Sequence, residues 1–304
     1  MSNRTLASLI PSVGAEPAKK AQTARLRLTL KIGELTTAFT AKPIRNLSIT
    51  YHDVVENQRH SDSGFPGPWA GIYKLEPEEF ARHLEAIRSD IGKRSVSVIG
   101  SGKSEAVYLT FDDGGASAHN LVASMLERYG WRGHFFITTD WIDRPGFVTA
   151  EQIRDLDRRG HVIGTHSCSH PTRMAELPWI EMLREWTESK NRLAQIVGHP
   201  VTVASLPGGY YSPRVAKAAA QAGIEALFTS KPATSAEFVD GCRVLGRYFV
   251  KRGMAPAYSG GFAGGKLVPR LKQACMWKIK GAAKQLGGRV YLQVAAAILN
   301  ARHF

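Results

Sequence analysis

The sequence predicts an α/β fold built on a parallel sheet or a (β/α) barrel. Between residues 46 and 230, short apolar runs of strand length alternate with longer runs whose apolar residues repeat at helical spacing. Several short runs end in polar residues or glycine. With 304 residues, 43% apolar and 22% charged, the chain can bury the core of one barrel-sized domain or of two smaller domains.

The alternation opens with two strands and two helices. NLSITYHDV (46–54) is an apolar run that ends in polar residues, which is typical of a strand. Residues 77–89 repeat apolar positions on one face after Pro77, which suits the start of a helix. VYLTF (107–111) predicts a buried strand, and 119–130 predicts a helix closed by glycine.

The same alternation continues to residue 230. HFFIT (134–138) predicts a strand, and 149–160 predicts a helix with Thr149 as its N-cap. HVIGTHS (161–167) predicts the next strand, before a long helix at about 176–197. The last three expected elements are a strand, a helix and a strand at 201–209, 213–223 and 225–230.

The net charge of +14 is concentrated at the two ends of the chain. Residues 1–45 hold eight Lys and Arg against two acids, and 251–304 hold ten against none, whereas 46–250 have a net charge of −2. We therefore expect a basic amino-terminal extension (1–45), a central domain (46–252) and a basic helical tail (253–304). Within the extension, 1–24 lack periodicity and are expected to be flexible, and 26–32 alternate like one half-exposed strand.

The tail segment 267–288 has the composition of a basic, partly amphipathic helix, with Arg270 away from the apolar side. That apolar side consists of Leu271, Cys275, Ile279 and Ala282. Such a helix could lie on an anionic membrane surface, or pack on the barrel with its lysines in solvent. Specific nucleic-acid binding is disfavoured, because the tail lacks interleaved aromatic residues and the central domain is slightly acidic.

Cysteine usage and hydropathy point to the cytoplasm. The three cysteines are widely spaced and odd in number, which argues against a disulfide framework. The first residues lack the apolar core of a secretory signal, and no apolar run reaches the roughly 18 residues of a membrane span. We expect a cytoplasmic protein, or one held at the inner face of the membrane by its basic tails; the sequence predicts no oligomeric state.

Residues capable of chemistry follow four of the expected strands. Carboxyl ends of parallel strands meet at one edge of a sheet or barrel, so these residues should gather there. They are His52 and Asp53, Asp112 and Asp113, His166 and His170, and Pro207, Gly208 and Gly209.

The pair His166 and His170, together with a carboxylate, could form a three-ligand site for a divalent metal such as Zn²⁺. A pair of histidines four apart is weak on its own in a chain with ten histidines. The paired acids Asp112 and Asp113 could equally belong to a simple turn with capping side chains. A cation would relieve their repulsion, however, and would leave one carboxylate to act as a base.

TFDDGG (110–115) followed by HSCSH (166–170) resembles the polysaccharide deacetylases, metal-dependent carbohydrate esterases also described as the chitooligosaccharide deacetylase homology group. The resemblance extends over about 46–252, which would then be the catalytic domain. It implies a deformed parallel (β/α) barrel, a divalent metal that is most often Zn²⁺, and hydrolysis of N-acetyl groups on an N-acetylated glycan. By the same resemblance Asp112 would be the general base, and the metal ligands would be Asp113, His166 and His170.

The third motif of that family departs from its usual form here. The family has Arg-x-Pro-x-Gly, whose arginine orients the base, but SLPGG places Ser205 in the arginine position. We expect the loop of Pro207, Gly208, Gly209 and Tyr210 to persist as a substrate-binding element, with the Gly208 backbone N–H as the candidate oxyanion donor. Arg247 is our candidate to orient Asp112.

The family's late Leu-x-His motif, which supplies the catalytic acid, is also absent after Pro207. ITYHDV (49–54) resembles the opening strand of a circularly permuted branch that acts on poly-N-acetylglucosamine, in which the acid comes from the first strand. His52 is therefore the candidate to protonate the leaving amine, the alternative being a residue that caps the strand end.

Aromatic residues near the expected mouth of the barrel could stack on sugar rings or serve as half-buried packing. They are Trp69, Tyr73, Trp141, Tyr210 and Tyr211. The favoured function is deacetylation within exopolysaccharide or cell-surface glycan synthesis. Two alternatives stay open: a metal-dependent amidohydrolase acting on a small non-sugar amide, and a glycan-binding module without catalysis.

Overall fold

The computed structural model describes residues 44–56 and 59–285, with side chains up to residue 279. The expected flexible segment 1–24 and the expected strand 26–32 lie outside these residues. Within them, one ten-stranded sheet runs in the order β10-β1-β3-β4-β5-β6-β7-β9-β8, and β2 pairs with β3 off this path. The strands are β1 (Asn46–Tyr51), β2 (Ser95–Val96), β3 (Ala106–Phe111), β4 (His134–Ile137), β5 (Val162–Thr165), β6 (Val203–Ser205), β7 (Ala226–Phe228), β8 (Glu237–Val239), β9 (Cys242–Leu245) and β10 (Tyr248–Phe249).

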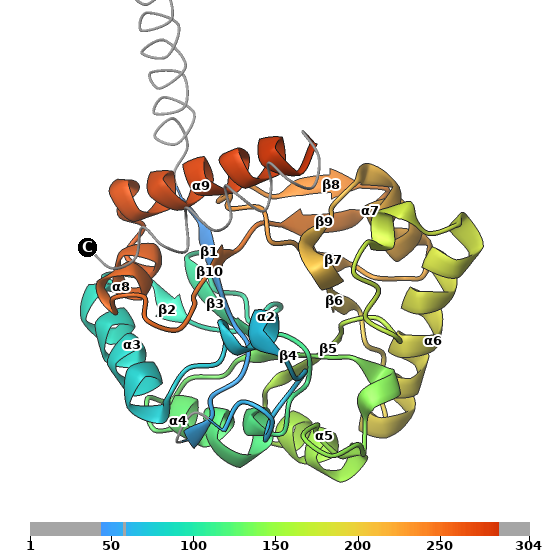
Figure 1. Ribbon diagram of the computed structural model, residues 1–304, viewed down its shortest axis with the longest axis horizontal. Coiled ribbons are helices and arrows are strands. Elements are labelled where there is room, and N and C mark those ends of the chain that lie inside the picture. Colours follow the sequence, from blue (N-terminus) through green and yellow to red (C-terminus); the bar gives the residue numbers. More distant parts are fainter. Residues whose placement is uncertain (1–43, 57–58, 286–304) are drawn as a thin grey trace, which may run out of the picture. The chain divides into compact units, whose positions relative to one another are not determined.

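The sheet is curled, and the helices that connect its strands lie outside it (Figure 1). All strand pairs are parallel except β8 with β9, and β10 and β8 form the two edges of an open barrel. The prediction of a deformed parallel (β/α) barrel is confirmed. The α-helices are α2 (Pro68–Gly71), α3 (Pro77–Asp90), α4 (Ala123–Glu127), α5 (Ala150–Arg158), α6 (Trp179–Val197), α7 (Pro213–Gln221), α8 (Ala257–Ala263) and α9 (Leu267–Gln285).

The strands and helices expected between 46 and 230 are present, with small shifts at their ends. The expected helix at 119–130 begins as a π-helix, η2 (Ala118–Val122), before it continues as α4. Thr149 is the N-cap of α5, as predicted: its side chain accepts a hydrogen bond from the Gln152 backbone (3.1 Å), and the Gln152 side chain accepts one from the Thr149 backbone (3.0 Å).

The sequence pattern missed the last three strands, β8 to β10. β10 has only two residues, and β8 is an exposed edge strand, so neither carries a readable alternation. β10 nevertheless matters for the site, because it returns across the open barrel to pair with β1 (Ile49 with Tyr248). Arg247, directly before β10, is thereby brought beside the first strands of the domain.

The described part of the tail packs against the sheet. The Tyr51 hydroxyl donates a hydrogen bond to Ser259 of α8 (2.9 Å). The Gln273 side chain in α9 both accepts from the Phe249 backbone and donates to it, each at 2.9 Å. Of the two arrangements considered for this helix, these contacts correspond to the packed one.

The predicted faces of the tail helix are wrong. Cys275 and Ile279, expected on its apolar side, are exposed, whereas Arg270 and Gln273 are buried. The reason is that the buried side of α9 is held by polar contacts: Arg270 donates to the Lys266 carbonyl (3.2 Å), and Gln273 bonds to the β10 backbone. None of the helices among the described residues is long and apolar enough to cross a membrane. All three cysteines are free, as expected.

Candidate active site

The paired acids at the end of β3 point to one site because of an unusual backbone turn. Asp113 itself takes a positive φ of 75°, and Gly114 follows with a φ of 82°. Alternate residues of a strand would otherwise face opposite sides of the sheet. A positive φ is unfavourable for a residue with a side chain, so the surrounding structure must stabilise this turn.

Arg247 binds the Asp112 carboxylate through both of its terminal nitrogens. Nη1 donates to Oδ1 (2.7 Å) and Nη2 to Oδ2 (2.8 Å), and both residues are buried. Nη2 also donates to the Ser205 hydroxyl (2.8 Å). Burial alone would raise the pKa of Asp112, but the Arg247 guanidinium, together with the nearby His166 and His52, outweighs it and lowers that pKa.

These contacts account for the serine in the third motif. The Ser205 side chain is short enough to leave room for a guanidinium that arrives from before β10, and its hydroxyl accepts a hydrogen bond from it. Thr110 Oγ1 (3.1 Å) and the Thr229 carbonyl (3.2 Å) accept from the same guanidinium. Arg247 is therefore fixed against Asp112 by three further partners.

Asp113, His166 and His170 form a compact set of potential metal ligands. Asp113 Oδ1 lies 3.4 Å from His166 Nε2 and 3.5 Å from His170 Nε2. One potential ligand atom from each of the three lies within 4.8 Å of the others. Nδ1 of His166 is 2.9 Å from the Ser205 carbonyl, to which it donates, so Nε2 is the ring nitrogen that faces the cluster. One carboxylate and two imidazoles at this spacing fit a divalent metal ion.

Burial disfavours the charged form of each group in this cluster, and the neighbouring charges decide the outcome. At Asp113 the hydrogen bond from His166 and the nearby imidazoles outweigh burial and lower the pKa. At His166 the two carboxylates outweigh burial and raise the pKa. Burial, together with the charge of His166, lowers the pKa of His170 to about 4. His170 is thus neutral near pH 7, as a metal ligand must be.

A buried glutamate that sequence reasoning missed holds the HSCSH loop in place. Glu185 of α6 is 3% exposed and accepts hydrogen bonds from the backbone N–H groups of Cys168 (2.8 Å) and Ser169 (2.9 Å). It also accepts from the Ser169 hydroxyl (2.7 Å). His170 sits at the end of this loop with a positive φ of 60°. A sequence signal did exist: Glu185 stands beside Trp186 on the buried face of α6.

His52 lies at the end of β1, at the same edge as the acids. Its ring packs against Tyr73 at 4.7 Å between centroids. It is near enough to Asp112 and Asp113 that its positive form helps to lower the pKa of each, after the larger effects of burial and of their closer partners. Among the described residues no group hydrogen-bonds to its buried Nδ1 atom.

The remaining predicted residues lie on loops next to the histidine loop. Gly208 (φ 65°) packs so closely on the Thr172 carbonyl that an added Cβ would overlap it. Tyr210 lies beneath the Arg173 guanidinium, 5.2 Å from its ring centroid. Trp141 packs on Phe65 at 5.0 Å between ring centroids. Pro207, Gly209 and Tyr210 therefore belong to a segment adjoining the cluster. Trp141 reaches the cluster through Phe65, whose ring also contacts that of His170.

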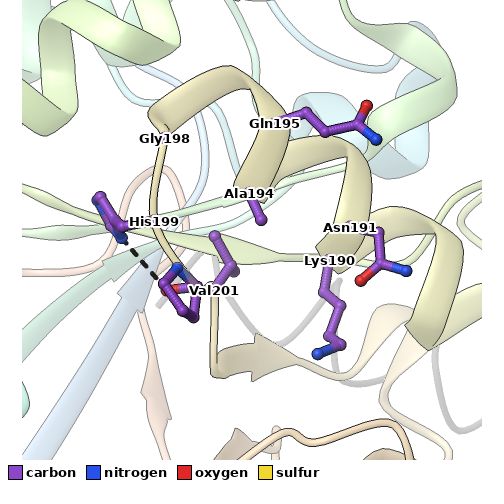
Figure 2. A pocket seen from close by; sticks show the side chains of 8 residues that line it. Lys190, Asn191, Ala194, Gln195, Gly198, His199 and Val201 are labelled. Atoms are coloured by element: carbon purple, nitrogen blue, oxygen red, sulfur yellow. Dashed lines mark hydrogen bonds between the residues drawn. The ribbon is translucent and has the colours of Figure 1, made fainter.

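A separate surface hollow lies between the end of α6 and the residues that precede β6 (Figure 2). It is lined by residues 190–201, including Lys190, His199 and Val201. It adjoins the amino-terminal end of β6, whereas Ser205 and the loop that follows it are at the carboxyl end. His199 there bonds to Asp157 (2.9 Å) on the surface. The hollow is therefore distinct from the cluster of acids and histidines.

Residues 100–227 match the family described as polysaccharide deacetylase. The putative polysaccharide deacetylase YxkH of Bacillus subtilis is 25% identical over 158 residues, which cover 52% of this chain and 56% of that protein. The peptidoglycan-N-acetylmuramic acid deacetylase PdaA of Bacillus subtilis is 26% identical over 159 residues, 51% of this chain and 57% of that protein. The chain thus spans little more than half the length of these curated relatives.

Solved structures share the fold. The deacetylase PplD of Streptococcus pyogenes, solved with acetate, superposes with a TM-score of 0.58 at 17% identity, covering 71% of this chain and 96% of that one. IcaB from Ammonifex degensii gives a TM-score of 0.55 at 18% identity, with coverages of 73% and 98%. The curled parallel sheet is therefore one that these proteins also have.

Proposed function

Because the chain carries a domain of the polysaccharide deacetylase family, we propose that it hydrolyses N-acetyl groups on the sugars of a glycan, releasing acetate and a free amine. One observation carries the proposal: an ionised, arginine-bound carboxylate, Asp112, stands next to the Asp113, His166 and His170 cluster. A base beside a metal-ligand set is what hydrolysis of an unreactive amide requires.

Asp113, His166 and His170 would hold the divalent metal, most simply Zn²⁺. When bound, such an ion supplies Lewis-acid chemistry, in that it polarises a carbonyl and makes water more acidic. The hydrogen bond from His166 Nδ1 to the Ser205 carbonyl orients the ring so that Nε2, the other ring nitrogen, faces the cluster.

Asp112 would be the general base. Its two oxygens are fixed by Arg247, so the carboxylate has one orientation and stays ionised near neutral pH. It would take a proton from the attacking water at an oxygen lone pair that the guanidinium leaves free. The backbone N–H groups of the Gly208–Tyr210 loop would stabilise the negative charge that develops on the acetyl oxygen.

His52 would be the general acid. It follows β1 at the same edge of the sheet, and its imidazole would donate a proton to the leaving amine. Its place on the first strand, together with an arginine from before the last, supports an assignment to the permuted branch and to poly-N-acetylglucosamine-type substrates. Exopolysaccharide or cell-surface glycan synthesis is the corresponding process.

Acetate release tests this function. The purified protein, supplied with Zn²⁺, is assayed on a panel of N-acetylglucosamine oligomers and on small cyclic amides. We expect acetate from the oligomers, and Asp112→Asn should bind metal normally yet release about 100-fold less. Turnover of the small amides alone, or glycan binding without turnover, would contradict the proposal.

We also propose that the protein resides in the cytoplasm and contacts the inner face of the membrane through its basic tails. Support comes from α9, where Val268 is 74% exposed and Ile279 is 53% exposed next to exposed Lys272 and Lys278. Basic residues near anionic lipid add about 1 kcal/mol each. The fraction of protein that co-sediments with anionic vesicles should fall when Val268 and Ile279 are both changed to Ser. An unchanged bound fraction would contradict this proposal.

A further inference from the structure

Residues 60–73, here called the arch, cross the carboxyl edge of the barrel between β1 and α3. In its first half Phe65 packs against the ring of His170 (4.8 Å between centroids), and at its last residue Tyr73 packs against His52 (4.7 Å). The arch includes the short helix α2, which lies over the middle of the barrel in Figure 1. The arch therefore joins a potential metal ligand to the candidate acid.

A buried lysine fixes the arch. Lys74 is 2% exposed, and its ammonium donates to three backbone carbonyls: those of His60 (2.5 Å), Ser63 and Phe65 (2.7 Å). An ammonium has three N–H donors, so all of them are used on the arch. Side-chain entropy and desolvation both oppose burying a lysine. The burial of Lys74 therefore suggests that the fixed conformation of the arch serves a function.

Asp53 fixes the same segment from below. Its Oδ1 atom accepts from the hydroxyls of Ser63 (2.5 Å) and Ser117 (2.9 Å). Gly64 and Gly115 approach its carboxylate so closely that a Cβ at either would overlap it. Asp53 thus ties the arch, through Ser63 and Gly64, to Gly115 and Ser117, which follow β3. Only glycine leaves room for the carboxylate at positions 64 and 115.

The middle of the arch presents one large apolar side chain to solvent. Trp69 in α2 is 63% exposed, although its indole is the largest apolar surface in the segment. It is four residues from Phe65 and four from Tyr73, so about 14 Å of chain at most separates it from either. An exposed indole on a rigid support is a suitable platform for the apolar face of a sugar ring.

We propose that the arch is a preformed subsite for a second sugar of the glycan, with Trp69 stacking on the residue next to the one being deacetylated. Lys74 acts as a positioning residue, because it holds the backbone from which Trp69 projects. This inference rests on the proposed deacetylase function and adds to it a preference for oligomers over single sugars.

The experiment compares kcat/KM for a tetramer of N-acetylglucosamine with kcat/KM for the monosaccharide in the metal-loaded full chain. In Trp69→Ala we expect the tetramer-to-monomer ratio to fall about tenfold, chiefly through a higher KM for the tetramer. Trp69→Phe should retain most of the ratio. Phe238→Ala is the matched control, since Phe238 is 71% exposed on the edge strand β8, and its ratio should equal that of the wild type.

Lys74→Met separates positioning from general stability. Its ratio should fall as in Trp69→Ala, and the double variant should fall no further than Trp69→Ala alone, because both changes act through one side chain. A thermal melt shows whether Lys74→Met folds. If it does not fold, the substrate ratio of Trp69→Ala alone tests the subsite. An unchanged ratio in Trp69→Ala overturns the subsite. Wild-type protein that releases no acetate from either substrate contradicts the deacetylase function itself.

Discussion

Replacing Arg247 with Ala removes the one cation bonded to the Asp112 carboxylate in the described part of the chain. Both residues are buried, and their two hydrogen bonds are 2.7 and 2.8 Å long. Removing one member of a buried pair costs about 3–5 kcal/mol, because the other charge is left without compensation. Asp112 will respond by taking up a proton, since burial alone raises the pKa of a carboxyl group. The expected loss in kcat/KM near pH 7 is about 100-fold, through loss of both ionisation and orientation of the base.

The pH profile distinguishes this effect from misfolding. Asp112 acts as a base only when ionised, so activity falls on the acid side, at pH values below its pKa. Arg247 holds that pKa down; without Arg247 it rises, and the acid limb of kcat/KM must move to higher pH. Arg247→Lys keeps the charge but loses the paired contact, and should shift the limb less than Arg247→Ala.

A relocation variant makes the test sharper. Ser205→Arg combined with Arg247→Ala puts the guanidinium back at the third-motif position, next to the same carboxylate. We expect this double variant to recover part of the lost activity and to return the acid limb toward the wild-type position, measured as acetate release from pH 4 to 9. An acid limb that stays in place in Arg247→Ala, with activity retained, would refute the role given to Arg247.

Three further results are expected. Glu185→Gln should raise the metal dissociation constant about 10–100-fold in a competition assay with a chromophoric chelator, whereas Glu188→Gln, 58% exposed on the same helix, should not change it. Removing metal with a chelator should abolish acetate release, and added Zn²⁺ should restore it; activity that persists in the chelated protein would contradict the metal site. Burial lowers the pKa of His134 from 6.5 to about 4, so the unfolded chain binds this proton first and the free energy of unfolding should fall by about 3 kcal/mol as pH drops from 6.5 to 4. Denaturant titrations of His134→Gln should show a shallower fall over that range.

Much of the fold and part of the site could be predicted because they depend on local sequence. The period of the apolar residues identified the strands, and parallel strands put their carboxyl ends at one edge. That rule was enough to expect Asp112, Asp113, His166 and His170 near one another. The potential ligand atoms of the last three lie within 4.8 Å of one another. Placing Arg247 required the pairing of β10 with β1, which joins residues about 200 positions apart through a two-residue strand. No local pattern carries that information.

The buried charges beyond the motifs were missed for a different reason. Lys74 and Glu185 are residue types that usually lie on the surface, so a sequence gives them a surface position by default. Each is buried because backbone groups of a loop satisfy it, and the loop conformation depends on the whole fold. Glu185 could have been identified from the sequence, because it lies on the apolar side of α6, where a charged residue is unexpected.

The arginine that binds Asp112 stands at position 247 in this chain, whereas the third motif of the family has it at the position of Ser205. Asp112 needs a guanidinium at bonding distance. Position 247 delivers it here, and we expect that an arginine at position 205 would reach the same carboxylate, because one Arg247 nitrogen, Nη2, bonds both Asp112 Oδ2 and Ser205 Oγ at 2.8 Å. Two arginines would repel each other and overfill the space that Ser205 now leaves open. Positions 205 and 247 are therefore coupled: an arginine at one requires a small residue at the other. Ser205→Arg alone should consequently destabilise the protein, while the same substitution in the Arg247→Ala background should stabilise it, and equal effects in the two backgrounds would show that the positions are independent.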